Sequence, residues 1–190
     1  MSAAPLLRLE EVALLRGGRL LFERLTLRIA AGEALLLTGP NGIGKSSLIR
    51  VAAGLLRASA GLVERHGSAA LADEGLALDP RQALADALRF WARLDGGDER
   101  VGMDAMGLAR LAPVPVRMLS TGQRKRAVLA RVISAGAPLW LLDEPGNGLD
   151  AEGLTRLGAA MAAHRAGGGA ILAASHQPLG LDDARTVALA

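Results

Sequence analysis

The sequence predicts an α/β fold with a mostly parallel, doubly wound sheet, and two observations carry this prediction. First, three short apolar runs are typical of strands that are covered on both faces: residues 33–38 (EALLLT), 139–143 (LWLLD) and 170–175 (AILAAS). Second, segments with helical character lie between or beside them, at 46–55 and 151–165. Strands and helices that alternate in this way form βαβ units, so we expect the three strands to be parallel.

A half-buried strand with a hairpin turn before it is expected nearer the N-terminus. Leu25, Leu27 and Ile29 alternate with Thr26 and Arg28, which is the period of a strand with one buried face. The preceding pair Gly17-Gly18 indicates the turn.

The region between the first two apolar runs is expected to be mostly helical, from about residue 80 to residue 135. Asp79-Pro80 has the pattern of an N-cap followed by proline at the first helical position. Helical spacing then continues through Ala83, Leu84, Ala87, Leu88, Trp91 and Leu94. Further along the chain, Gly167 to Gly169 are expected to end the helix at 151–165 and form a turn.

Length and hydropathy favour one domain, residues 1–190, in a soluble and unexported chain. Hydrophobic residues make up 51% of the sequence, yet no apolar run approaches the roughly 18 residues of a membrane-spanning helix. Glu10 and Glu11 interrupt the N-terminal stretch before the core of a signal peptide can develop.

Composition excludes several classes of site. Cysteine is absent, which excludes disulfide frameworks, thiolate metal sites and cysteine nucleophiles. The net charge is only +3, and two Phe, two Trp and no Tyr leave few platforms for stacking bases, so no nucleic-acid partner is expected. His66 and His164 are interpreted as ordinary packed or surface side chains.

The stretch GPNGIGKSS after the first apolar run matches the phosphate-binding pattern G-x-x-x-x-G-K-[ST] in its expected setting, between a strand and a helix. Glycines let backbone N–H groups surround phosphate oxygens, Lys45 reaches the β and γ phosphates, and the Ser46 hydroxyl binds Mg²⁺. The candidate nucleotide-binding residues are Gly39, Pro40, Asn41, Gly42, Ile43, Gly44, Lys45, Ser46 and Ser47.

Three polar residues lie at the ends of the other two apolar runs or directly after them. Asp143 ends the run 139–143, where a second Mg²⁺ ligand is expected, and Glu144 is placed to act as the general base on water. His176 follows the run 170–175 and is a candidate for hydrogen bonding to the γ phosphate. Because ligands of parallel sheets bind beyond the carboxyl ends of the strands, we expect these residues to meet the phosphate loop. Taken alone, Asp143-Glu144 would be an ordinary turn.

A second polar loop, LSTGQRKR at 119–126, opens a helix about seventy residues after the first. Ser120, Gly122 and Gln123 suit an anion, as residues at a helix N-terminus do. The alternative is a capped surface helix. For Arg124, Lys125 and Arg126 we adopt this alternative, which leaves all three solvated.

The order of these motifs (GPNGIGKSS, LSTGQ, LLDEP, Leu149-Asp150 and His176) resembles the nucleotide-binding domain of ATP-binding cassette (ABC) proteins over nearly the full chain. The resemblance implies a P-loop NTPase fold with a parallel sheet core, a small antiparallel β subdomain and a compact helical subdomain at about 80–135. It implies ATP and Mg²⁺ as cofactors, Glu144 and His176 as catalytic residues, and Asp150 as the D-loop aspartate. It also implies a homodimer in which Ser120, Gly122 and Gln123 of one copy cover the γ phosphate bound by the other.

The sequence departs from the family at three places. Arg16 stands where an aromatic residue normally stacks on adenine. The glutamine expected at the start of the helical region is missing, because Asp73 or Glu74 lies near that place and Gln82 comes too late. The signature loop also has Thr121 where glycine is commonest.

The short interval from Lys45 to Ser120 and the tail that begins SHQPL resemble the ATP-binding subunits of the cytochrome c biogenesis haem exporter, the CcmA family. This implies an ATPase on the cytoplasmic face of a bacterial inner membrane, held there by integral membrane permease subunits. It would drive haem export or release of a haem-loaded chaperone, with no direct haem binding expected. Two alternatives stay open: an ABC ATPase subunit for another cargo, and a soluble nucleotide-gated ABC module without transport.

Overall fold

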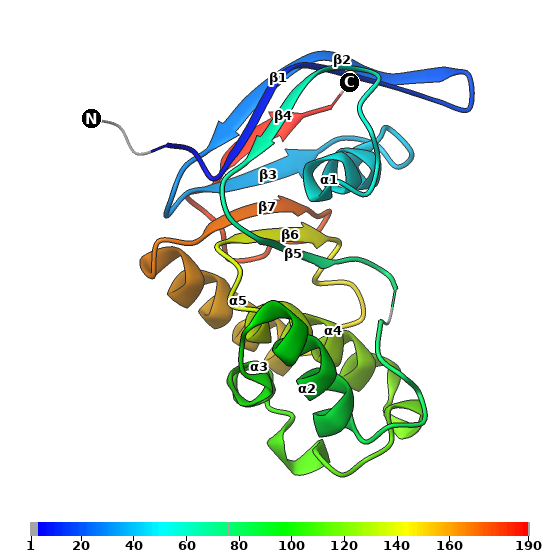
Figure 1. Cartoon of the computed structure of the whole chain (residues 1–190), viewed down its shortest axis with the longest axis vertical. Coiled ribbons are helices and arrows are strands. Elements are labelled where there is room, and N and C mark those ends of the chain that lie inside the picture. The colour runs from blue at the N-terminus through cyan, green and yellow to red at the C-terminus, as the bar shows by residue number, and fades with distance from the viewer. Residues whose placement is uncertain (1–3, 76, 190) are drawn as a thin grey trace.

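The computed structural model describes residues 4–75 and 77–189, and a parallel sheet runs through the middle of it (Figure 1). Within these residues the sheet has five strands in the order β5-β6-β7-β3-β8, and all neighbours are parallel. The strands are β3 (Ala34–Thr38), β5 (Ala69–Ala72), β6 (Leu139–Asp143), β7 (Ala170–Ala174) and β8 (Arg185–Ala188). The three predicted apolar strands are the three central ones, which confirms the predicted fold class.

A second, antiparallel sheet contains three strands in the described residues, in the order β2-β1-β4. They are β1 (Leu7–Arg16), β2 (Arg19–Ile29) and β4 (Ala60–Arg65). Gly17 and Gly18 join β1 to β2 with φ angles of 58° and 76°, as a two-residue hairpin turn requires. The predicted hairpin is confirmed.

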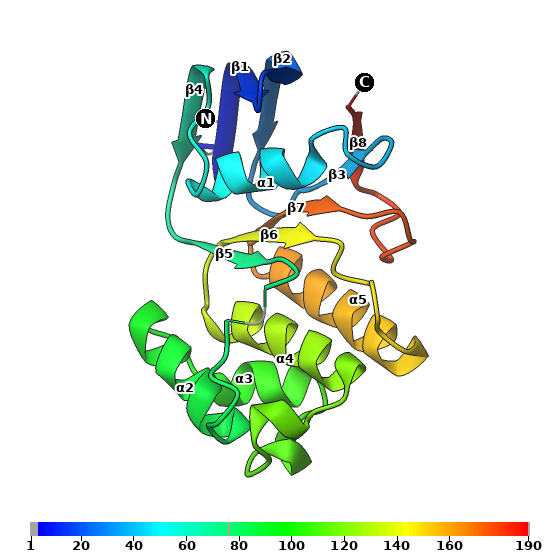
Figure 2. The same cartoon turned by 90° about the vertical axis from the view of Figure 1, so that its right-hand side faces the viewer.

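Alternate residues of the central strands serve two separate cores. Leu35, Leu37 and Leu141 point to one face, where they pack with the inner side of the antiparallel sheet and with α1 (Lys45–Ala53). Figure 2 shows α1 between the two sheets. Trp140 and Leu142 point to the other face, which the remaining helices cover. Burial of each large apolar side chain stabilises the fold by about 1.5–3 kcal/mol. Because both faces of these strands are buried, their sequences are continuous apolar runs.

The helices on the second face come mostly from the segment between β5 and β6. They are α2 (Leu84–Asp95), α3 (Glu99–Ala105), the 3₁₀ turns η1 (Ala109–Leu111) and η2 (Val116–Met118), α4 (Thr121–Ser134) and, after β6, α5 (Ala151–Ala166). No helix in residues 4–75 or 77–189 is long and apolar enough to cross a membrane.

The predicted start of the first of these helices is wrong. Asp79 accepts a hydrogen bond from the backbone N–H of Arg81 at 2.8 Å and so caps a turn, while α2 begins at Leu84. The backbone before α2 is instead paired with the segment after η1: the N–H of Leu84 donates to Val114, and the N–H of Val116 donates to Gln82. These long-range hydrogen bonds override the local N-cap pattern.

The two tryptophans lie in different surroundings. Trp140 in β6 stacks on the ring of His164 with centroids 3.9 Å apart, so His164 has the packing role expected of it. Trp91 in α2 lies edge-on to Phe90 and under the guanidinium of Arg131, 5.2 Å from the ring centroid.

Candidate functional site

The loop between β3 and α1 depends on glycine at two positions. Gly39 has φ 132°, and a Cβ there would lie 2.6 Å from the carbonyl oxygen of Leu189. Gly44 has φ 120° and is the N-cap of α1, where a Cβ would lie 3.3 Å from that of Leu21. No side chain of the described residues caps this helix. The first N–H groups of α1 and the positive end of its dipole are therefore left to an anion.

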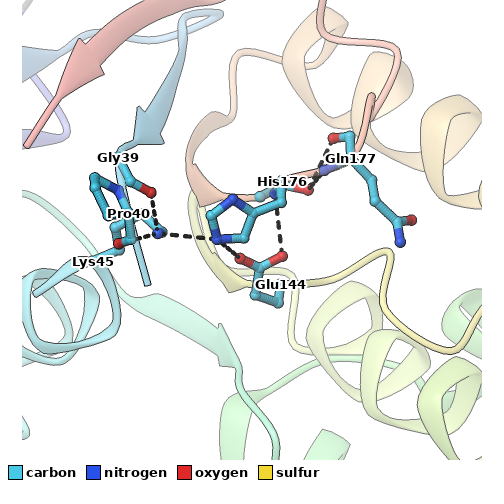
Figure 3. Close-up of polar contacts among 7 residues, drawn as sticks. Gly39, Pro40, Lys45, Glu144, His176 and Gln177 are labelled. Carbon is cyan, nitrogen blue, oxygen red and sulfur yellow. Dashed lines mark hydrogen bonds and ion pairs between the residues drawn. The ribbon is translucent and has the colours of Figure 1, made fainter. Parts of the chain in front are cut away.

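Lys45 lies at the centre of this loop and is only 7% exposed. Its Nζ donates to the carbonyl oxygens of Gly39 at 2.7 Å and Pro40 at 3.0 Å, and it lies 3.1 Å from Nε2 of His176 (Figure 3). The partners of this ammonium in the described residues are two carbonyl oxygens and an imidazole nitrogen, so no carboxylate there neutralises its charge. The positive charge is therefore available to a phosphate group.

Strained backbone holds Glu144 beside the ring of His176. Glu144 follows β6 with φ 48°, a left-handed conformation that costs a non-glycine residue about 1–3 kcal/mol. Its N–H donates to the carbonyl oxygen of Ala174 at 2.9 Å, which ties it to the end of β7. The carboxylate then accepts from the backbone N–H of His176 at 3.3 Å, as Figure 3 shows. The fold therefore places the end of β6 against the end of β7.

The contacts of His176 indicate its tautomer. Nε2 lies 3.1 Å from Nζ of Lys45 and 3.4 Å from Oε1 of Glu144. The ammonium can only donate, so Nε2 accepts and a neutral ring carries its proton on Nδ1. In this tautomer Nε2 donates nothing to Glu144, so this oxygen of Glu144 remains able to accept a proton from water.

Asp143 supplies a test of the predicted magnesium site. It is 6% exposed, and its Oδ1 has no hydrogen-bond partner in the described part of the chain. Burial raises the pKa of Asp143 above its ordinary value, and the neighbouring Ser46 hydroxyl opposes that rise. An unpaired carboxylate oxygen near a hydroxyl is a donor set that Mg²⁺ takes together with phosphate oxygens.

Other metal chemistry has less support. Within residues 4–75 and 77–189, no group of three or more His, Asp or Glu side chains is arranged to hold a metal ion. A metal ion at Asp143 would therefore need further ligands besides the described side chains, such as phosphate oxygens.

A cavity of about 600 Å³ brings most of the phosphate loop together with residues from other elements. The predicted residues that line it are Asn41, Gly42, Gly44, Lys45, Ser46, Ser47, Glu144 and His176. Arg16 and Glu74, which lie where the sequence departs from the family's motifs, also line the cavity. Leu21 and Asn147 line it as well, and the sequence did not predict them. Asn147 lies three residues after Glu144, in a turn that its N–H closes on the carbonyl oxygen of Glu144 at 3.2 Å, and nothing in the sequence singled it out.

Seven candidate binding residues do not line this cavity. Three of them, Gly39, Pro40 and Ile43, belong to the phosphate loop itself, and the other four, Ser120, Gly122, Gln123 and Asp150, lie on other elements. Ser120 is the N-cap of α4, where its hydroxyl accepts from the N–H of Gln123 at 3.3 Å and the Gln123 side chain accepts from the N–H of Ser120 at 2.9 Å. Gly122 faces the carbonyl oxygen of Gly148. Asp150 caps α5 by accepting from the N–H of Gly153 at 2.8 Å. None of the four contributes to the phosphate site of its own chain.

The interpretation of Arg124, Lys125 and Arg126 as three solvated side chains is wrong for two of them. Arg124 is exposed and donates to the carbonyl oxygen of Arg117 at 2.7 Å. Lys125 is partly buried, and desolvation lowers its pKa although the carboxylates of Asp143 and Glu74 oppose the change. The Nε atom of Arg126 is buried without a hydrogen-bond partner in the described residues. The first turn of α4 therefore packs inward, toward the carboxylates of the site.

Comparison with known proteins adds family information to this geometry. The family model described as ABC transporter matches residues 22–147. The chain is 58% identical over 181 residues to the "Cytochrome c biogenesis ATP-binding export protein CcmA" of Sphingopyxis alaskensis, covering 94% of this chain and 93% of that protein. It is 45% identical over 195 residues to the protein of the same description from Rhodospirillum rubrum, covering 95% and 84%.

Solved structures resemble the fold. The structure of an ATP-binding subunit of an ABC transporter superposes with a TM-score of 0.85 at 23% identity, covering 97% of this chain and 85% of that one. An ABC transporter ATP-binding protein from Pyrococcus furiosus gives 0.81 at 22% identity, covering 96% of both chains. At this level of identity the likeness supports the P-loop ABC fold alone.

Proposed function

This chain belongs to the ABC transporter family, and from that premise we propose that it is the ATP-hydrolysing subunit of a membrane complex for cytochrome c biogenesis. The identity to relatives described as cytochrome c biogenesis export proteins, over nearly the full length of both chains, supports this assignment. The complex moves haem or releases a haem-loaded chaperone. This subunit supplies the work, binds no haem itself, and is held at the cytoplasmic face of the inner membrane by permease subunits.

The observation that carries the ATPase mechanism is that His176 contacts both Lys45 and Glu144. The phosphate loop and the Lys45 ammonium bind the triphosphate, with its γ phosphate toward Glu144. Glu144 accepts a proton from the attacking water, and His176 positions the terminal phosphate by hydrogen bonding. Ser46 and Asp143 would hold Mg²⁺, which would supply positive charge to the phosphates when bound.

We assign the second phosphate contact to a second copy of the chain. Ser120, which is exposed, and Gly122, which is half-buried, lie outside the cavity of their own chain, at a helix N-terminus that suits an anion. In a head-to-tail homodimer this loop covers the nucleotide bound by the partner, with Asp150 at the interface. The whole chain, 1–190, then acts as one nucleotide-binding domain, and the helical subdomain at about 80–135 carries the signature loop.

Substitution Glu144→Gln tests the mechanism. We expect Mg·ATP binding to be kept, hydrolysis to fall by about 10³-fold because the general base is lost, and an ATP-dependent dimer to accumulate. Glu152→Gln, an exposed change on α5, is the matched control and should leave hydrolysis unchanged. A Glu144→Gln protein that stays monomeric at saturating ATP, even with its membrane partners, contradicts the paired site.

The cargo is tested in the host. Deletion of the gene should abolish covalent haem staining of c-type cytochromes, and the wild-type gene should restore it while the Glu144→Gln gene does not. Normal staining in the deletion strain would reject the cytochrome c assignment and leave the ATPase assignment intact.

A further inference from the structure

An exposed stretch of three residues, His176 to Pro178, connects the end of β7 to the interior of the molecule. Ser175, directly after β7, is 6% exposed, and Leu179 is 7% exposed. Both ends of the stretch are therefore fixed by packing, and its course over the surface depends on the hydrogen bonds of its own backbone. Within this stretch, His176 lines the nucleotide cavity.

Side chains hold the backbone on both sides of His176. The peptide before it donates its N–H to Oε2 of Glu144 at 3.3 Å. After it, the N–H of Gln177 donates to the Ser175 hydroxyl at 3.0 Å, and that hydroxyl donates to the carbonyl oxygen of Gln177 at 2.9 Å. Figure 3 shows the contacts of Glu144 with His176 and, beside them, the hydrogen bonds of the Gln177 backbone. Serine hydroxyls form such bonds where the chain has left regular structure.

The Ser175 hydroxyl is difficult to replace in this turn. It gives its one proton to the turn and also accepts there, so a single small group makes both bonds. Pro178 has no N–H, and the peptide after Gln177 therefore cannot donate to another group. Without the hydroxyl, the N–H and the carbonyl oxygen of Gln177 lose these bonds. The turn then shifts while β7 and Leu179 stay packed.

The imidazole of His176 depends on this turn once nucleotide is bound. In the free protein its Nε2 lies 3.1 Å from Nζ of Lys45 and 3.4 Å from Oε1 of Glu144. The side chain is 46% exposed, so packing contributes little to its position. In the proposed function Lys45 binds the phosphates, and the ring then loses one of its two present contacts. Its place is set mainly by the backbone, because staggered rotamers allow a histidine few directions from a fixed Cα.

We propose that Ser175 is a positioning residue for hydrolysis: its hydroxyl fixes the turn after His176 and so keeps the His176 imidazole where it meets the terminal phosphate. This inference rests on the proposed function, because it assumes that His176 contacts the γ phosphate of a bound nucleotide. Ser175 itself does not line the cavity. A displacement of about 1 Å at a reacting group can cost about 10²-fold in rate, so the effect falls on turnover more than on binding.

Steady-state phosphate release by the full chain with its membrane partners, over a range of Mg·ATP concentrations, tests this inference. Ser175→Ala should lower kcat by about tenfold and leave KM within about twofold, because the imidazole is misplaced while the phosphate loop is intact. Ser175→Thr keeps the hydroxyl and should hold kcat within about threefold of the wild type.

The matched control is Ser134→Ala. Ser134 is also buried, at 3% exposed, and its hydroxyl donates to the carbonyl oxygen of Glu99 at 3.3 Å, which joins α4 to α3. Ser134 does not line the cavity. This variant should keep the kcat of the wild type, and denaturant unfolding of both alanine variants shows whether their losses of stability match.

A double-mutant cycle separates positioning from general support of the fold. His176→Ala should lower kcat by about 10²-fold, and in that background Ser175→Ala should cost less than about twofold, since no imidazole is left to misplace. The inference is overturned by an equal loss in both backgrounds, by a wild-type kcat in Ser175→Ala, or by equal losses in Ser175→Thr and Ser175→Ala, and each of these leaves the ATPase assignment intact. A wild-type kcat in His176→Ala rejects the role of His176 together with this inference. A wild type that hydrolyses no ATP under these conditions rejects the proposed function itself.

Discussion

The phosphate loop before α1 and the signature loop before α4 both open a helix with glycine and hydroxyl residues, yet their helix ends are completed in opposite ways. At α1 the N-cap is Gly44, and no side chain of the described residues caps the helix. At α4, Ser120 and Gln123 form a full capping box. The first helix end therefore needs a ligand to satisfy its N–H groups, whereas the second is largely complete within its own chain.

This difference indicates how the two loops divide the work. The phosphate site carries a cost in the free protein, through the buried ammonium of Lys45, the strained backbone of Glu144 and the unpaired carboxylate oxygen of Asp143. We expect bound nucleotide with Mg²⁺ to relieve the part of this cost that comes from the two charges. The signature loop is already ordered by its cap, so in the proposed dimer it would meet the partner's nucleotide with little further loss of entropy.

The largest expected effect breaks the phosphate loop. Lys45→Ala should lower hydrolysis by about 10³-fold and weaken Mg·ATP binding strongly, because a buried donor to the transferring phosphate is removed. Nucleotide titration and a phosphate-release assay measure both effects. Arg57→Ala, a change of the same charge at an exposed position after α1, is the control. Wild-type affinity in Lys45→Ala would show that the triphosphate binds elsewhere.

An intermediate effect separates the two loops. Ser120→Ala should leave Mg·ATP affinity of the isolated chain within about twofold and lower hydrolysis by about 10²-fold, since one donor to the partner's phosphate is lost. It should also cost about 1 kcal/mol of stability through the lost cap. Asp98→Ala removes the cap of α3, where Asp98 accepts from the N–H of Arg100, and controls for the stability loss. An equal loss of binding and hydrolysis in Ser120→Ala would mean that the loop serves its own chain.

The smallest expected effect measures the cost of the phosphate site. Asp143→Asn should stabilise the nucleotide-free protein by on the order of 1 kcal/mol, because it removes a buried charge, and should abolish the Mg²⁺ dependence of ATP binding. Burial raises the pKa of Asp143, so the folded state binds this proton more tightly than the unfolded state does. The free energy of unfolding of the wild type therefore falls relative to the variant as pH rises from the ordinary aspartate pKa through the raised one.

Denaturant titrations at several pH values check this sign. The advantage of Asp143→Asn should be present at neutral pH and vanish in acid. An advantage that grows in acid would contradict the assigned direction.

Sequence patterns predicted the strands and the loop whose structure depends mainly on their own residues. Strands β3, β6 and β7 are visible because their own side chains are buried on both faces, and the loop before α1 is one continuous motif. Strands β5 and β8 have only four residues each and lie at the sheet edges, so their form depends on pairing with β6 and β3. The start of α2 was missed for a similar reason, because remote backbone groups bind the residues before it.

The same distinction applies to the site. Lys45, Asp143, Glu144 and His176 could be predicted because each lies at the end of a recognisable strand or after it. Leu21 and Asn147 could not, since only the tertiary fold brings β2 and the turn after β6 to one cavity. The inward packing of Lys125 was also invisible, because a run of basic residues carries no sign of what covers it.

The two tryptophans provide an optical probe for each region. Trp140 is 4% exposed in the strand that ends at Asp143, and its ring lies against His164, so its emission is expected at short wavelength and reports the sheet beneath the nucleotide. Trp91 lies in α2 beside Arg131, on the helical side of the molecule. Since the chain has no other tryptophan and no tyrosine, single Trp→Phe variants would let intrinsic fluorescence follow each region separately, without an attached dye.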